Sequence, residues 1–239
     1  MTDVTPRAAK TNKTVGRTAS KEVRRQQLIE ATIESIARYG ISGTTTTTVT
    51  GFAGLSLGLV NFHFKNKETL MEETLRCLAQ EHSAHWQKRV QAAVNDPATQ
   101  LQAQVDSHFH PDICTRKKLA VWFNFYGEAQ YRAAYRRIVA EMDNERWDVS
   151  VDLCGQLIRQ GGYEGLNARD IADTLEGLYD GFWLNIMIYP GSFTRKMAHT
   201  RLHQYLATVF PRHFDSQTGL IGADFPKTSD ACAASPCKG

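Results

Sequence analysis

The chain is poor in the features that mark membrane, secreted and disulfide-stabilised proteins. No apolar run approaches the roughly 20 residues that a membrane span needs, and residues 1–20 lack the apolar stretch of a secretory signal. The five cysteines are odd in number and scattered along the chain, which argues against a disulfide framework. We therefore expect a soluble, cytoplasmic protein.

Signatures of catalysis and of cofactor binding are also missing. The sequence has no G-x-S-x-G motif, no phosphate-cradling glycine loop and no dinucleotide fingerprint. Some histidines have spacings that suit a metal on a helix, but no Cys or carboxylate cluster lies near them in the sequence to complete a site. We therefore expect no catalytic residue, no metal site and no cofactor. The histidine pairs concerned are His82 and His85, His108 and His110, and His199 and His203.

Positive charge is concentrated in the first quarter of the chain. Residues 1–67 contain ten Lys and Arg against four Asp and Glu, a net charge of +6, whereas the rest of the chain carries −3. A basic segment suits contact with DNA because neutralising its phosphates releases counterions. From charge alone, DNA contact and a solvated basic tail are equally good interpretations.

Helical periodicity runs through nearly all of the chain between two polar ends. The ends lack periodicity and are predicted to be disordered. No strand alternation of useful length occurs between them, so we expect an all-α fold. The first helix is expected to end at Tyr39, with Gly40 as a left-handed C-cap. Helices are predicted near 21–39, 66–95, 97–109, 114–129, 132–160, 167–188 and 194–209, with two short helices on either side of Gly54.

Residues 44–68, TTTTTVTGFAGLSLGLVNFHFKNKE, have the pattern of a helix-turn-helix. Gly54 can supply the positive φ that a tight turn between two helices needs. Ser56 is a good N-cap for the second helix, with a hydroxyl that would satisfy a free N–H group. That helix would bury Val60 and Phe64, which are four residues apart, and turn the residues between them toward a DNA groove.

In these residues the chain resembles the TetR family of bacterial regulators. The resemblance covers about residues 20–70 and rests on Gly54, Leu55, Ser56 and Gly58, followed by His63, Phe64, Lys67 and Leu70. It implies a phosphate-binding threonine at the start of the second helix, a capping serine, groove-facing residues, and a histidine and a lysine that grip the DNA backbone. The corresponding residues of this chain are Thr46, Ser56, Leu57, Gly58, Asn61, Phe62, His63 and Lys67.

Two departures from the family pattern leave the operator sequence open. Where tyrosine is common, this chain has Asn61, which either pairs with an adenine edge or is a solvated surface amide. The second helix is rich in β-branched threonine and contains Gly51, so it is intrinsically a poor helix and must rely on packing. Of the basic residues around the first helix, Arg24 and Arg25 are those we expect to contact DNA.

The C-terminal part resembles one subgroup of that family, the choline-responsive BetI-type repressors of glycine-betaine synthesis. This resemblance covers about residues 115–210 and rests on AVWFNFYGEA at 120–129 and LYDGFWL at 178–184. It implies choline or betaine aldehyde as the effector. Aromatic faces attract quaternary ammonium groups, but aromatic residues at helical spacing usually fill a core, and both interpretations remain open. The candidate ligand-binding residues are Trp122, Phe125, Tyr126, Tyr179, Asp180 and Trp183.

We expect the last two helices to form a four-helix bundle with a second copy, through apolar residues that include Leu202 and Leu206. Such a homodimer would present two recognition helices to a pseudo-palindromic operator. Alternatives are a regulator of another catabolic or efflux pathway and, more remotely, a helical enzyme or an adaptor that does not bind DNA. The predicted segments are a basic arm (1–20), a DNA-binding domain (21–67), a sensing and dimerisation domain (68–214) and a tail (215–239).

Overall fold

The computed structural model describes residues 20–130, 132–216 and 219–221. These residues are almost entirely helical, which confirms the predicted all-α class. The predicted arm and most of the predicted tail lie outside the described residues. The helices are α1 (Lys21–Gly43), α2 (Thr46–Ala53), α3 (Leu57–Phe64), α4 (Lys67–Ala92), α5 (Pro97–His108), α6 (Arg116–Ala129), α7 (Ala133–Gly161), α8 (Ala168–Ile188) and α9 (Arg195–Val209).

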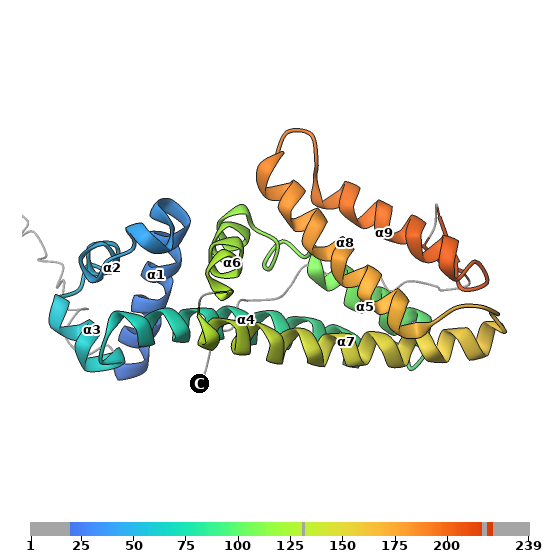
Figure 1. Cartoon of the computed structure of the whole chain (residues 1–239), viewed down its shortest axis with the longest axis horizontal. Helices are drawn as coiled ribbons and strands as arrows, with labels where there is room; N and C mark the ends of the chain where they lie inside the picture. The colour runs from blue at the N-terminus through green and yellow to red at the C-terminus, as the bar shows by residue number, and fades with distance from the viewer. Residues whose placement is uncertain (1–19, 131, 217–218, 222–239) are drawn as a thin grey trace, which may run out of the picture.

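The first three helices form a small bundle at one end of an elongated molecule (Figure 1). Gly54 ends α2 with a φ of 62°, which confirms its predicted role in the turn. The threonine-rich α2 begins with a capping box, in which Thr45 and Thr48 each accept a hydrogen bond from the other's backbone N–H. This box supports a helix that its residue composition alone disfavours. The bundle has its own buried core, which consists of Leu28, Ile29, Ala31, Val49, Val60, Phe64, Leu70 and Cys77.

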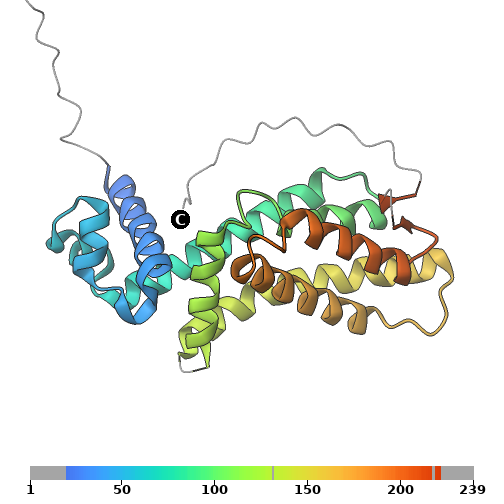
Figure 2. The same ribbon diagram turned by 90° about the horizontal axis from the view of Figure 1, so that it is seen from above.

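The remaining helices form the larger, C-terminal domain. The long helices α4 and α7 run along its base, α5 and α8 pack on them, and α9 packs on α5 and α8 (Figures 1 and 2). Helix α6 contacts α1 on one side and α7 and α8 on the other, so it joins the two domains. Cys114 and Cys154 are free thiols buried in this domain. Among the described residues, no helix combines the length and hydrophobicity that crossing a bilayer requires.

Two expectations about the fold were wrong, and a third was confirmed in part. The regular part of α1 ends at Tyr39 as predicted, because Gly40 leaves the helical region with a φ of 70°, but its ψ of 175° is not that of a left-handed C-cap and one further turn continues to Gly43. The start of the predicted tail instead forms a two-stranded antiparallel pair, β1 (Phe214–Asp215) and β2 (Gly219–Leu220), because Phe214 and Leu220 are buried against the domain. Leu202 and Leu206 also point into the protomer's own core and are fully buried there.

Candidate functional site

The recognition helix α3 presents an unusually apolar surface. Val60 and Phe64 are buried against α1, as their spacing predicts. On the opposite side, Leu57 is 53% and Phe62 68% exposed. Gly58 and Asn61 are exposed with them, and no atom lies within 4 Å of the position a Cβ would take on Gly58. The four predicted groove-facing residues therefore share one open face, and the open space at Gly58 permits a close approach of the backbone to DNA.

The residues assigned to the DNA backbone come from α2, from α3 and its N-cap, and from the start of α4. Lys67 is the first residue of α4 and directly follows the helix-turn-helix, and Thr46 is the first residue of α2. Ser56 occupies the N-cap position of α3, but its exposed hydroxyl makes no capping hydrogen bond, so that part of its prediction was wrong. Burial, followed by the positive charges of Lys21 and Arg25, lowers the pKa of His63, so its imidazole is neutral near pH 7.

The two arginines assigned to DNA, both near the start of α1, have partners inside the domain. Arg25 pairs with Glu73 of α4 and lies 5.5 Å from the ring centroid of Phe64. Arg24 donates to Gln27 at 2.9 Å. Contact between either guanidinium and DNA would require it to exchange or share these partners. Lys21, which our assignment to DNA left out, lies 5.7 Å from the ring centroid of the exposed Phe62 and so stands next to the recognition helix.

Aromatic side chains from four helices meet in the centre of the C-terminal domain. The ring centroids of Trp122 in α6 and Trp183 in α8 are 6.5 Å apart. Tyr179 stacks on His108 of α5 at 3.8 Å, and His82 of α4 lies edge-on to Trp183 at 5.5 Å. These five side chains, which we call the aromatic box, are all at least nine-tenths buried. The structure thus brings together three of the six predicted ligand-binding residues.

The other three predicted residues lie elsewhere. Phe125 is fully buried and packs edge-on against Tyr135 of α7, which is a core contact. Tyr126 lies beside Trp122, with ring centroids 5.8 Å apart, at the edge of the box. Asp180 is exposed on α8. Asp180 is therefore not a wall of the buried box.

Negative charge is in excess beside the aromatic box. The buried guanidinium of Arg146 donates to Glu176 at 3.0 Å and pairs with Asp143 at 3.0 Å. Partial desolvation, and then the negative charges of Asp143 and Glu176, raise the pKa of Asp180 to about 6. Three carboxylates therefore face one arginine, an arrangement that a bound cation would stabilise.

Several polar atoms in and next to the box have no hydrogen-bond partner among the described residues. They are both ring nitrogens of His82, the indole N–H of Trp86 and the hydroxyl of Tyr179. An unpaired buried polar group costs about 1–3 kcal/mol, so such a cluster marks a place where a ligand or water completes the bonding. Burial, and then the charge of Arg146, keep the pKa of His82 and of His108 well below the usual value. Neither histidine was among the residues predicted to bind the effector. The spacing of residues along one helix does not reveal which side chains of other helices lie beside them.

Helix α6 links the aromatic box to the DNA-binding domain. Two residues after Trp122, Asn124 accepts a hydrogen bond from the backbone N–H of Ile41 at 3.3 Å. Ile41 follows the kink of α1, and a Cβ on Gly40 would lie only 3.2 Å from the Asn124 oxygen, so a larger residue there would push Asn124 away. A displacement of α6 therefore acts directly on the kinked end of α1.

The outer side of α8 is apolar and contains small residues. Leu184 is 38% and Ile188 49% exposed. Gly177 and Gly181, on the same side, have no atom within 4 Å of a Cβ position. Together these four residues form what we call the α8 stripe, and a second helix could approach it closely.

Sequence comparisons match both domains to described families. Residues 28–74 match "Bacterial regulatory proteins, tetR family", and residues 97–211 match "BetI-type transcriptional repressor, C-terminal". The HTH-type transcriptional regulator BetI of Burkholderia thailandensis is 31% identical over 186 residues, which are 78% of this chain and 93% of the relative. Its counterpart from Burkholderia ambifaria is 30% identical over the same shares of both chains.

Solved structures have the same fold. A putative transcriptional regulator from Pseudomonas aeruginosa PAO1 gives a TM-score of 0.73 at 24% identity, covering 81% of this chain and 93% of that one. A putative transcriptional regulator from Saccharomonospora viridis, solved in complex with choline, gives a TM-score of 0.70 at 18% identity and covers 78% and 96%. The chain therefore belongs to the TetR family of helix-turn-helix transcriptional regulators, with a C-terminal domain of the BetI type.

Proposed function

We propose that this regulator represses transcription in the cytoplasm by binding a pseudo-palindromic operator as a homodimer, and that a small quaternary ammonium compound of the choline class releases it. The observation that carries the effector proposal is the aromatic box with its excess of carboxylates. Aromatic faces and negative charge together favour an organic cation over a neutral or anionic ligand. The BetI names of the sequence relatives and the choline-bound structural neighbour support the same class.

The roles at the DNA follow from the exposed residues of α3 and its surroundings. We assign Leu57, Gly58, Asn61 and Phe62 to the groove, and Thr46, Ser56, His63 and Lys67 to phosphates. The α8 stripe supports dimerisation, because two such stripes related by a two-fold axis would pack closely and present two α3 helices to one duplex.

Binding at the box reaches the DNA-binding domain by two routes. Helix α4 holds His82 at the box and Lys67 at its start, 15 residues away, so one rigid helix about 22 Å long connects them. Helix α6 holds Trp122 and Asn124, of which the second contacts α1. The dimer would have two arrangements, one in which the spacing of the two α3 helices fits the operator and one in which it does not. An effector lowers operator affinity only to the extent that it binds the second arrangement more tightly than the first.

Titration calorimetry tests the effector with three ligands: choline, betaine aldehyde and 3,3-dimethylbutan-1-ol, the neutral isostere of choline. Choline or the aldehyde should bind and weaken operator affinity, and the isostere should bind much more weakly because it lacks the charge. Trp183→Leu should abolish choline binding. The matched control is Phe125→Leu, which also removes a buried aromatic ring but should keep choline affinity. Equal loss in both variants, with folding intact, would reject the box as the effector site.

Fluorescence anisotropy with operator and random DNA tests the DNA assignments separately. Lys67→Ala should weaken binding to both duplexes and lower the salt slope by about one. Asn61→Ala should cost about 1–3 kcal/mol at one base pair of the operator and little on random DNA. The control is Arg159→Ala, an exposed cation on α7. Identical effects of the Lys67 and Asn61 variants on both duplexes would contradict the division of roles.

A further inference from the structure

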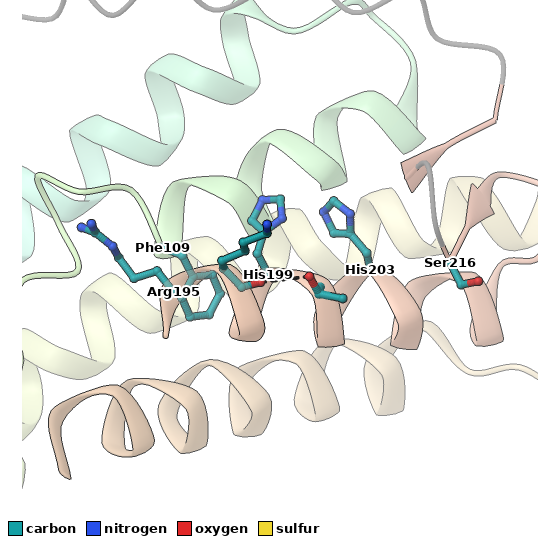
Figure 3. Close-up of a pocket in the computed structure, with 7 residues that line it drawn as sticks. Phe109, Arg195, His199, His203 and Ser216 are labelled. Carbon is teal, nitrogen blue, oxygen red and sulfur yellow. Dashed lines mark hydrogen bonds between the residues drawn. The ribbon is translucent and has the colours of Figure 1, made fainter. Parts of the chain in front are cut away.

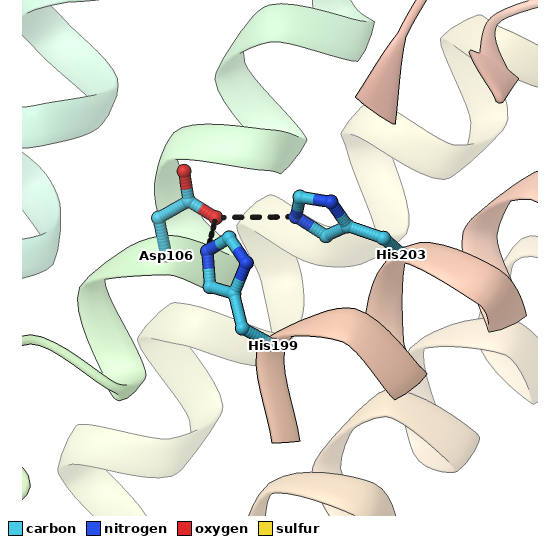
Figure 4. Close-up of side chains that lie close together, drawn as sticks. All are labelled: Asp106, His199 and His203. Atoms are coloured by element: carbon cyan, nitrogen blue, oxygen red, sulfur yellow. Dashed lines mark ion pairs between the residues drawn. The ribbon is translucent and has the colours of Figure 1, made fainter. Parts of the chain in front are cut away.

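Three side chains of metal-ligand type, distant in the sequence, meet between α5 and α9 (Figure 4). His199 and His203 are four residues apart on α9 and so lie on one face of it. Asp106 faces them from α5. Its Oδ1 atom is 2.5 Å from Nε2 of His199 and 3.5 Å from Nε2 of His203. One ligand atom from each residue lies within 4.8 Å of the others.

We propose that Asp106, His199 and His203 form a binding site for a divalent transition metal ion of the zinc class. In a tetrahedral site with bonds of about 2.0–2.1 Å, neighbouring ligand atoms are about 3.3 Å apart. The two measured separations, 2.5 and 3.5 Å, lie on either side of that value, so small side-chain rotations create the site. Two imidazoles and one carboxylate suit zinc, cobalt, nickel or copper, whereas magnesium and calcium prefer oxygen ligands alone.

The surroundings already hold the three ligands in place. The buried side chain of Gln102 donates from its amide nitrogen to Asp106 at 2.5 Å and also contacts Nε2 of His203, a contact that the metal ion would replace. On the other side, a Cβ on Gly219 of β2 would lie 3.5 Å from Nδ1 of His203, so the strand pair covers that ring.

A second observation at the same place is an unpaired polar atom. Gln102 is only 3% exposed, and its amide oxygen has no hydrogen-bond partner among the described residues. A buried carbonyl oxygen without a donor costs free energy. A water molecule bound to the metal is a donor of the kind this oxygen lacks. Outer hydrogen bonds of this type commonly orient the ligands of metal sites.

The site opens to solvent on its other side. Both histidines line a groove of about 430 Å³, together with Phe109, Arg195, Lys196, Thr200 and Ser216 (Figure 3). An open groove gives a metal ion access and leaves one coordination position for water or an external ligand. A divalent ion with one carboxylate and two neutral imidazoles keeps a charge of +1. With Arg195 and Lys196 nearby, this charge favours an anionic external ligand.

Metal binding would fasten α9 to α5. Two residues after Asp106, His108 stacks on Tyr179 in the aromatic box. The proposed site is therefore separate from the effector site but lies on one of the helices that form it. A metal ion that binds only the folded protein stabilises it by RT ln(1 + c/Kd), where c is the free metal concentration, so the stabilisation grows with the logarithm of that concentration.

The test uses the full chain without a histidine tag, stripped of metal with a chelator and titrated with Zn²⁺ by calorimetry. We expect one ion per protomer, and a tetrahedral spectrum when Co²⁺ replaces Zn²⁺. His199→Gln and His203→Gln should each weaken Zn²⁺ binding by about tenfold or more. Thr200→Ala, on the same helix, and His85→Gln, a histidine of α4, are the matched controls and should bind Zn²⁺ as the wild type does.

Thermal unfolding gives an independent measurement for the same variants. Zn²⁺ should raise the unfolding temperature of the wild type and of the two controls, but not of His199→Gln or His203→Gln, and Mg²⁺ should have no such effect. The proposal is overturned if the wild type binds no Zn²⁺ at micromolar concentrations, or if the two ligand variants, folded by circular dichroism, bind it as tightly as the wild type.

Discussion

The residues assigned to the DNA groove lie on the surface of the N-terminal domain, whereas the aromatic box proposed for the effector lies in the core of the C-terminal domain. Phe62 is 68% exposed on α3, and Trp122 is 1% exposed on α6. Substitutions on α3 can therefore change DNA recognition while the small core beneath it stays intact. In our proposal the side chains of the aromatic box both pack the core and bind the effector, so changes in ligand specificity and in stability are coupled there.

The largest expected effect compares one aromatic residue from each domain. Trp122→Ala should lower the free energy of unfolding by about 3–5 kcal/mol, because it leaves a large cavity. Phe62→Ala should change stability by no more than about 0.5 kcal/mol, because its ring is solvent-exposed, yet it should weaken operator binding. Urea unfolding and operator titration of both variants measure this. Similar stability losses in the two would remove the contrast between the domains.

The second prediction concerns the α8 stripe and replaces the expectation about Leu202 and Leu206. Leu184→Glu combined with Ile188→Glu should cost about 2 kcal/mol or more of dimerisation free energy, since charge would enter the centre of an apolar interface. Sedimentation should then show a folded monomer with weak operator binding. Val94→Glu, at a position 71% exposed outside the stripe, is the control. A double variant that sediments as an unchanged dimer would place the interface elsewhere.

A third prediction tests the connection between the two domains. Asn124→Ala removes the hydrogen bond to Ile41 while leaving the aromatic box in place. It should reduce the coupling between effector and operator by about 0.5–2 kcal/mol, with effector affinity nearly unchanged. Operator affinity measured with and without saturating effector gives the coupling directly. The control is Asn144→Ala, at an exposed position on α7. If coupling is unchanged, the signal passes through α4 alone.

The smallest effect is a pH dependence due to Asp180. Because its pKa is raised to about 6 in the folded protein, its ionisation disfavours folding, and this destabilisation grows as the pH rises from about 4 through 6. Asp180→Asn should therefore be more stable than the wild type at pH 7.5, by less than about 1 kcal/mol because solvent screens an exposed group. The difference should shrink toward pH 4. Urea unfolding at both pH values measures it, with Asp148→Asn as the control. A difference independent of pH would contradict the assignment.

The order of the helices, most of their bounds and the face that α3 presents could all be predicted from the sequence. They depend on local causes: helical periodicity, the proline at 97, the turn glycine at 54, and the four-residue spacing of Val60 and Phe64. Local causes did not settle every boundary. Gly40 has the positive φ that ends the regular part of α1, but one further turn follows to Gly43, and Thr44 at its C-cap donates back to the carbonyl oxygens of Gly40 and Ile41.

Only the tertiary structure decided which side chains from different helices meet. The sequence showed the aromatic residues of α6 and α8. It did not show that Phe125 packs in the core or that His82 and His108 complete the box. The same limit explains the histidine pair of α9. No carboxylate lies near it in the sequence, and Asp106 reaches it only because α5 packs against α9. The spacing of residues along one helix determines which of them lie on the same face of that helix. The packing between helices determines which residues of other helices that face contacts.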